Sequence, residues 1–262
     1  MSYRFPSDSL GNVVPDTPLL ITAGLAVGLA YGLFGVGSAV ATPVLSLLGV
    51  TGMSAVVGPL PALLPGSAAG AWTYARGGKV DWRVARLTLA GAAPAAVAGA
   101  LASRWVGAPV LLTLSGVVLL VAGVRVLRPG PTAGPRADAR RASTAFVVSA
   151  AVVVGFAAGL LANGGGFLLV PLFLVVLGLD LNEAAGTSLM VAAALTVPTI
   201  VTHLAIGDVD LGIATVFAVG LVPGAVGGSL VAQHLPVARL RLAFGAFLVV
   251  FAGWFLLRRI AG

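Results

Sequence analysis

Long stretches of this chain contain no charged side chain, and the longest runs from residue 17 to residue 75. The other charge-free stretches are 87–103, 105–124, 142–179, 184–207, 211–238 and 242–257. A helix crosses a bilayer with about 20 mostly apolar residues, so the longest stretch must hold more than one segment. Only 9% of all residues are charged, against roughly 25% in a typical soluble domain. The chain is therefore expected to be an all-α polytopic membrane protein, and a soluble domain is excluded.

Several other classes of protein are also excluded. Runs such as 117–121 lack the alternation of apolar and polar residues that marks a β-barrel strand. The chain has no cysteine, so it has no disulfide and no thiolate metal site. The glycines at 35–37 are not followed by the lysine of a phosphate-binding loop. We therefore expect no enzyme activity, no cofactor and no metal.

The hydrophobic segments form two sets of five. The first set lies near 18–36, 38–49, 54–75, 83–104 and 108–127, and the second near 143–162, 166–178, 184–206, 210–233 and 237–257. This divides the chain into a polar N-terminal tail (1–17), a first transmembrane repeat (18–127), a basic Pro/Gly-rich linker (128–142) and a second transmembrane repeat (143–259).

The two sets are predicted to be copies of one another. A shift of 129 residues superposes 76–128 on 205–257 without a gap and keeps landmark glycine, proline and aspartate residues in order. The matching pairs include Gly78 and Gly207, Asp81 and Asp210, Gly91 and Gly220, Pro94 and Pro223, and Gly99 and Gly228. Internal duplication is a hallmark of secondary transporters.

The distribution of basic residues favours inverted copies. The loop around Arg76, Lys79, Arg83 and Arg86 lies two helices before the basic linker, so both should lie on the cytoplasmic side. The matching loop of the second half has Asp208 and Asp210 and no basic residue, as expected on the opposite side. Five segments per half would place both termini outside. Parallel copies, with both termini inside, remain the alternative.

A glycine-rich break near the start of each half is the clearest candidate site. The breaks span 32–38 and 159–166, and the segments that follow are too short to cross about 30 Å of hydrocarbon untilted. A helix that begins inside the membrane presents free backbone N–H groups and a positive dipole end, which suit an anion. The candidate substrate-binding residues are Gly35, Gly37, Ser38, Asn163, Gly164, Gly165 and Gly166. The competing interpretation is that these glycines only permit close helix packing.

Hydroxyl and ionisable side chains extend this candidate site. Thr187 and Ser188 could line an anion path, or could bond to carbonyls of the preceding helical turn. His203 aligns with Tyr74, and both are candidates for a proton or substrate role. His203 lies close to Gly207, so an interfacial position is the alternative. Asp81 and Asp210 are expected to cap helix starts.

At the breaks the sequence resembles the sulfite exporter TauE/SafE family, whose members carry duplicated halves with a "G-x-x-G-x-G-G-G-F-L-x-x-P" signal, a "G-T-S-L" element and a "G-x-V-D" loop. The second half matches through 159–171, 186–189 and 207–210. In the first half, Ser38-Ala39 and Gly58-Pro59-Leu60 replace parts of the first two elements, while Gly78-Lys79-Val80-Asp81 keeps the third. The resemblance implies a multi-pass transporter in a prokaryotic inner (cell) membrane for small sulfur-containing anions, such as sulfite or organosulfonates.

The leading functional hypothesis is a secondary transporter, and specifically an exporter, that works by alternating access at the breaks. The alternatives are an anion channel of the same fold and an intramembrane hydrolase that uses Ser188 with His203. The expected partners are a small anionic substrate and the lipid bilayer, and a homodimer is left open. No nucleic-acid partner is expected, because the basic residues cluster in short loops and suit anionic lipid headgroups.

Overall fold

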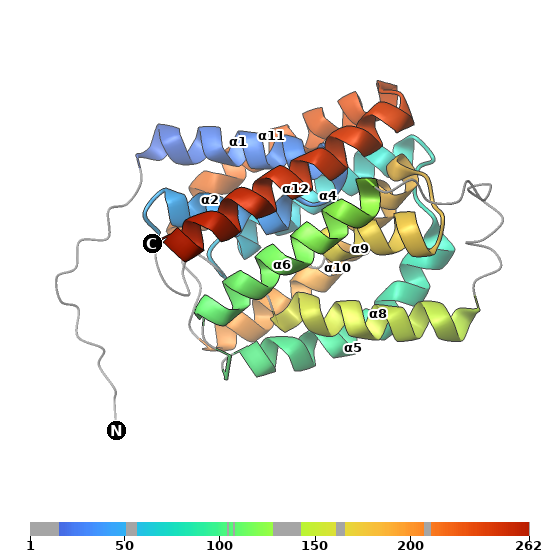
Figure 1. Ribbon diagram of the computed structural model, residues 1–262, viewed down its shortest axis with the longest axis horizontal. Helices are drawn as coiled ribbons and strands as arrows, with labels where there is room; N and C mark the ends of the chain where they lie inside the picture. Colours follow the sequence, from blue (N-terminus) through green and yellow to red (C-terminus); the bar gives the residue numbers. More distant parts are fainter. Residues whose placement is uncertain are drawn as a thin grey trace.

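A computed structural model describes residues 16–50, 57–103, 105–106, 108–127, 143–160, 166–206 and 211–261. These residues form helices (Figure 1). The helices of the first half are α1 (Thr17–Phe34), α2 (Gly37–Leu47), α4 (Leu60–Arg76), α5 (Trp82–Ser103) and α6 (Ala108–Leu127). Those of the second half are α8 (Thr144–Leu160), α9 (Gly166–Pro171), the π-helix η1 (Leu172–Val176), α10 (Leu181–Ile206), α11 (Leu211–His234) and α12 (Val237–Ala261). The predicted segments are therefore confirmed as helices over most of their described residues, with α4 beginning at Leu60.

Helix ends follow local sequence signals. The Asp81 carboxylate accepts hydrogen bonds from the backbone N–H groups of Arg83 and Val84, both at 3.0 Å, so it caps α5 as expected. Asp210 lies outside the described residues. Asp180 caps α10 by accepting a 2.8 Å bond from the Glu183 N–H. This cap explains why α10 begins at Leu181 rather than at the predicted residue 184.

Five of the described helices are long and apolar enough to cross a membrane. The stretches that meet this criterion are Thr17–Phe34, Trp82–Ser103, Leu181–Leu204, Leu211–His234 and Val237–Leu257. Helix α10 is the most buried of them, with 61% of its most apolar window inside the protein. It therefore forms the centre of the bundle, while the other four leave more of their apolar surface to lipid.

Two pairs of helices pack unusually closely because both partners contribute small residues. α1 lies along α11, and α5 lies along α8. In the first pair, a Cβ on Gly28 would collide with the backbone of Leu221, and a Cβ on Gly224 would lie 2.5 Å from the Leu25 carbonyl oxygen. In the second pair, a Cβ on Gly99 would collide with the Phe156 carbonyl oxygen. Such small residues spaced along two helices allow the backbones to touch within a bilayer.

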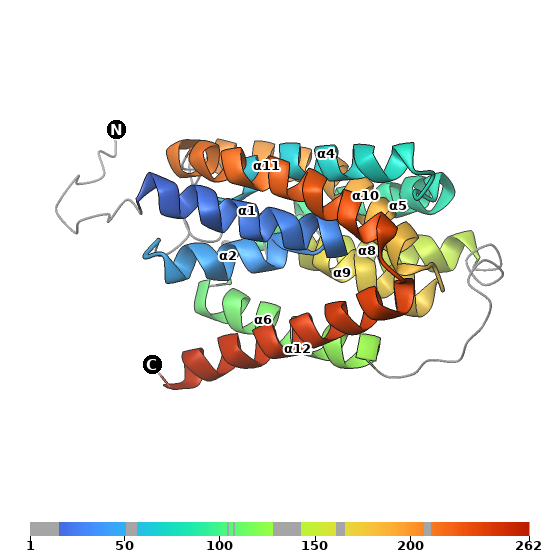
Figure 2. The same cartoon turned by 90° about the horizontal axis from the view of Figure 1, so that it is seen from above.

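The order of the contacts gives the direction of each helix. Along α1 and α11 the residue numbers of the contacting residues increase together, from Gly24 against Phe217 to Gly32 against Ser229, so these helices are parallel. Between α4 and α10 they run oppositely, because Gly70 meets Leu189 whereas Tyr74 meets Gly186. α6 and α12 are also antiparallel: Gly116 meets Leu256, and Gly123 meets Leu248. α1 starts and α12 ends at one end of the bundle, opposite the loop between α4 and α5 (Figures 1 and 2).

Candidate functional site

The first glycine-rich break is a sharp turn between α1 and α2. Gly35 adopts a left-handed conformation (φ 72°), which favours glycine, and its N–H donates a 2.8 Å hydrogen bond to the Tyr31 carbonyl. Gly37 then begins α2 directly against the Tyr31 side chain, leaving no room for a Cβ. The N-cap residue of α2, Val36, provides no side-chain cap. The first N–H groups of α2 therefore lack the usual side-chain acceptor, which is the condition for binding an anion there.

The break of the first half lies against helices of the second half. A Cβ on Gly35 would lie 2.9 Å from a methyl carbon of Val170 on α9 and 3.2 Å from the Cα of Ala185 on α10. α2 and α9 are in contact, and Figure 2 shows them following one another along the long axis of the bundle. Because Gly32 packs against Ser229, before α11 ends at His234, the break lies within the length of the bundle. The two short helices thus meet inside the protein.

The second break is only partly described. Gly166 is the first residue of α9, whereas Asn163, Gly164 and Gly165 lie outside the described residues. The same holds for the side chain of Ser38, although its backbone belongs to α2. The predicted shortness of both segments is confirmed, since α2 ends at Leu47 and η1 ends at Val176.

Tyr74 has a defined structural role. Its hydroxyl donates a 2.8 Å hydrogen bond to the Gly32 carbonyl, in the last turn of α1, and lies 3.5 Å from the Leu33 carbonyl. These carbonyls have no partner within their own helix. Tyr74 therefore caps α1 from α4 just before the break, and its proton is already used in this bond.

Thr187 connects the two halves. Its buried hydroxyl oxygen accepts a 2.9 Å hydrogen bond from the backbone N–H of Asp81, at the start of α5. Beside it, Gly186 packs against the Tyr74 ring and the Lys79 carbonyl. The loop of the first half therefore rests on the Gly-Thr-Ser element of the second half. Neither earlier interpretation of Thr187, an anion path or a bond to the preceding turn, anticipated this contact.

Helix α10 carries a stripe of buried polar side chains: Ser188, Thr196, Thr199 and His203. Their spacing of eight, three and four residues places them near one face of the helix. Thr196 and Thr199 donate to the Ala192 and Leu195 carbonyls at 2.7 and 2.8 Å, as hydroxyls in membrane helices commonly do. His203 is only 1% exposed, so its side chain lies inside the helix bundle.

The hydrolase hypothesis conflicts with this geometry. Ser188 and His203 both belong to the continuous helix α10. At 1.5 Å per residue their fifteen-residue separation corresponds to roughly 22 Å along the axis. A nucleophile and its base must lie within hydrogen-bonding distance, so these two residues cannot act as a pair in one chain.

Tyr31 is a candidate site residue that the sequence interpretation missed. It is fully buried, one turn before Gly35, and its hydroxyl makes no hydrogen bond with the described residues. Ser67 faces it from α4 without a hydrogen bond of ordinary geometry, and the Ser67 hydroxyl donates to the Leu63 carbonyl at 2.7 Å. A buried hydroxyl without a partner is costly unless a ligand or water satisfies it. The available signal was a polar side chain inside a charge-free segment.

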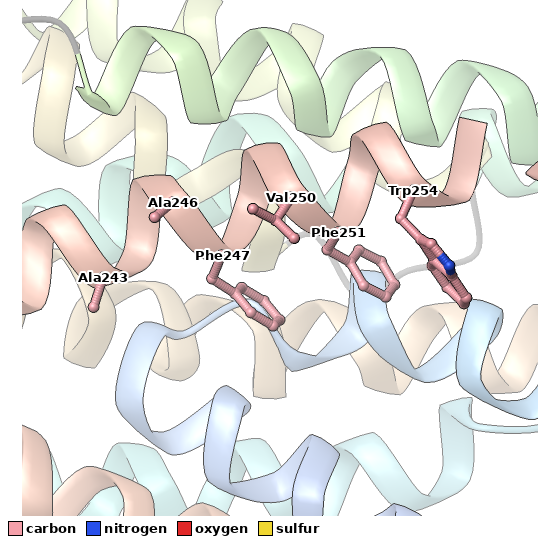
Figure 3. Close-up of a pocket in the computed structure, with 6 residues that line it drawn as sticks. All are labelled: Ala243, Ala246, Phe247, Val250, Phe251 and Trp254. Carbon is pink, nitrogen blue, oxygen red and sulfur yellow. The ribbon is translucent and has the colours of Figure 1, made fainter. Parts of the chain in front are cut away.

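An aromatic ladder leads from the break onto α12. Phe34 stacks on Phe244 and Phe247 with ring centroids 5.3 and 5.7 Å apart, and Phe251 continues the ladder. Figure 3 shows Phe247, Phe251 and Trp254 projecting from the same helix. They line a groove of about 480 Å³ that has no charged lining residue. This apolar surface suits lipid chains. An anion would find no charged or backbone donor group among these lining side chains, so the break at Gly35 is the better candidate for an anion site.

The chain was compared with known proteins. The profile described as "Sulfite exporter TauE/SafE" matches residues 20–259. Two proteins named "Probable membrane transporter protein", from Xylella fastidiosa strains Temecula1 / ATCC 700964 and 9a5c, are 30% and 29% identical to it over 244 residues. Each alignment covers 89% of this chain and 93% of the relative. No solved structure matches the chain. The match over nearly all of its length shows that this multi-pass membrane protein belongs to the sulfite exporter TauE/SafE family of transporters.

Proposed function

We propose that the protein is a secondary transporter that exports small sulfur-containing anions, such as sulfite or an organosulfonate, across the inner membrane of a prokaryotic cell. The observation that carries this proposal is the meeting of α2 and α9 beside Gly35. Both are short helices that begin at glycine, and α2 has no side-chain cap. This arrangement suits a small anion held by backbone N–H groups, and the family description supplies the sulfur chemistry.

We infer that the binding site comprises both starts and the polar groups around them. Gly35, Gly37, Ser38, Asn163 and Gly164 to Gly166 would offer backbone N–H groups and short polar side chains. The Tyr31 hydroxyl would donate to a substrate oxygen, which would satisfy a buried donor near the break that makes no hydrogen bond with the described residues. Thr187 and Tyr74 would hold the surrounding backbone in place through their bonds to Asp81 and Gly32. Ser188 and His203 would serve the path along α10.

We further propose that the two halves are inverted repeats and that they exchange access to the site. Two pairs of helices at equivalent places in the two halves support this proposal, because the contacts of α4 with α10 and of α6 with α12 run in opposite directions. The helix pairs also match between the halves. The predicted correspondence pairs α1 with α8 and α5 with α11, and α1 packs on α11 just as α8 packs on α5. Rocking of such inverted units about a shared site is the usual basis of alternating access.

Transport by purified protein in liposomes tests this proposal. Vesicles loaded with unlabelled sulfite or a small sulfonate should accumulate the labelled anion by counterflow. Counterflow requires a carrier that reorients, so downhill leak without it would indicate a channel instead. Absence of flux for both anions would contradict the substrate class.

Tyr31→Phe tests the site itself. Loss of one hydrogen bond to a substrate oxygen should lower counterflow about tenfold at limiting substrate. The variant should keep the thermal unfolding midpoint, because the hydroxyl makes no hydrogen bond with the described residues. Thr22→Val is a matched control, since the exposed Thr22 hydroxyl donates to the Leu19 carbonyl of its own helix. Normal counterflow in Tyr31→Phe would remove Tyr31 from the site.

A further inference from the structure

A groove between α4 and α11 lies apart from the proposed transport site. Its volume is about 520 Å³. The two helices run parallel here, because Gly66 on α4 meets Leu221 on α11, and Gly77, just beyond α4, meets Gln233. The groove therefore extends along both helices toward the same end of the bundle, where the loop between α4 and α5 begins (Figure 2).

The groove changes from apolar to polar along its length. Ala69 and Val226 line its inner part, and the half-exposed Leu230 follows. Arg76 and Gln233 line its outer part, at the ends of α4 and α11. A phospholipid has the same order of groups, with apolar acyl chains below a phosphate at the membrane surface. A free anion would have no use for the apolar inner part.

Arg76 is held in place without a carboxylate partner. Its guanidinium carbon lies 5.4 Å from the centroid of the Trp72 ring, in cation–π geometry. It forms no ion pair with the residues that the structure describes. The Gln233 amide donates one N–H to the Ser229 carbonyl at 3.0 Å, which leaves its second N–H for a ligand. The groove thus offers a charged and a neutral donor toward one anionic group.

We propose that this groove binds the phosphate of an anionic phospholipid, with Arg76 and Gln233 as donors, Trp72 as the platform for Arg76, and the acyl chains along Ala69, Val226 and Leu230. Lys79, Arg83 and Arg86 follow Arg76 in sequence and give this end of the bundle its positive charge. Basic pockets between membrane helices recognise anionic headgroups in this way. This proposal does not depend on the transported substrate.

The test uses the full chain in neutral detergent after removal of bound lipid. Phosphatidylglycerol is titrated while the thermal unfolding midpoint is followed, and native mass spectrometry counts the lipid retained. The wild-type protein should gain stability with one bound lipid. Arg76→Gln should bind about fivefold more weakly. Arg86→Gln is the matched control, because Arg86 is exposed on the same basic segment, outside the groove, where its Nε donates to the Trp82 carbonyl.

Two further comparisons complete the test. The first compares lipid phosphate with free phosphate, and the second uses a variant that keeps Arg76. Phosphatidylcholine, and free phosphate or glycerol 3-phosphate at equal concentration, should protect much less than phosphatidylglycerol. Trp72→Leu keeps the charge of Arg76 and should still weaken binding, which covers the case in which Arg76→Gln fails to fold. Equal weakening by Arg76→Gln and Arg86→Gln would overturn the proposal in favour of general surface charge. Equal protection by free phosphate would indicate a soluble anion, and no retained lipid would remove the site.

Discussion

The Tyr74 hydroxyl lies 2.8 Å from the carbonyl oxygen of Gly32 and donates a hydrogen bond to it. This bond joins α4 to the last turn of α1, immediately before Gly35 turns the chain into α2. The end of α1 before the first glycine-rich break is therefore capped by a residue 42 positions later in the sequence. The proposed anion site adjoins this contact, because α2 begins at Gly37, directly after the break.

Removing this hydrogen bond should weaken the fold. Tyr74→Phe leaves the Gly32 carbonyl without its partner in a buried place, at a cost of about 1 kcal/mol in the free energy of unfolding. Thermal unfolding in detergent measures the effect. Tyr31→Phe removes another buried tyrosine hydroxyl and serves as the control. This hydroxyl makes no hydrogen bond with the described residues, so its loss should not lower the midpoint. Equal midpoints for the two variants would contradict the assigned capping role.

Thr187 should be required for its hydroxyl rather than its shape. Thr187→Val keeps the size of the side chain but leaves the Asp81 N–H unpaired, which should cost about 1 kcal/mol. Thr187→Ser keeps the acceptor and should recover most of this loss. The comparison is made by thermal unfolding, with Thr22→Val as an exposed control. A valine variant as stable as the serine variant would show that the bond to the loop contributes nothing.

Glycines at the α1–α11 contact should not tolerate a methyl group. A Cβ on Gly28 would collide with the backbone of Leu221, which has no freedom to rotate away. Gly28→Ala should therefore destabilise the protein by roughly 1–3 kcal/mol. Gly253→Ala on α12 is the matched control: its Cβ would meet nothing within 4 Å, and alanine should add up to about 1 kcal/mol by favouring the helix. Unchanged stability in Gly28→Ala would mean that the two helices can separate without cost.

Inverted repeats predict opposite labelling of equivalent positions. Trp82 and Leu211 begin α5 and α11, are 53% and 58% exposed, and correspond at the shift of 129 residues. The chain contains no cysteine, so Trp82→Cys and Leu211→Cys each introduce a single label site. An impermeant thiol reagent on intact cells should modify Leu211→Cys, whereas Trp82→Cys should react only after permeabilisation. Labelling of both from one side would establish parallel repeats.

The helices were predictable because the bilayer restricts what a segment inside it can be. Charge-free stretches gave nearly all the helix ends to within a few residues, as at α5 and α11. The Asp81 cap was also predictable, since a capping carboxylate acts within three residues of its own position. α10 begins at Leu181, three residues before its predicted start, because Asp180 caps it.

The candidate site was only partly predictable. The glycine of the break at Gly35 stands out in the sequence, and its left-handed turn confirms the interruption. Gly32, in the same stretch, serves packing instead, because it lies against Ala225 and Ser229 of α11. Nothing local distinguishes these two glycines. Nothing in the local sequence distinguishes Tyr31 from Tyr74 either. The Tyr74 hydroxyl caps α1, whereas the Tyr31 hydroxyl makes no hydrogen bond with the described residues.

The sequence by itself determined the membrane class and the places of the helices, and it predicts their correspondence between the two halves. These follow from the cost of placing charge or unpaired backbone in hydrocarbon, which acts on each segment separately. Only the tertiary structure decided that α1 lies on α11 and α8 on α5, and that α2 meets α9. It also decided which hydroxyls form hydrogen bonds with other helices or loops, as those of Tyr74 and Thr187 do. Those outcomes depend on the close fit of surfaces far apart in the chain, and glycine-rich apolar helices look nearly alike until they are packed against their partners.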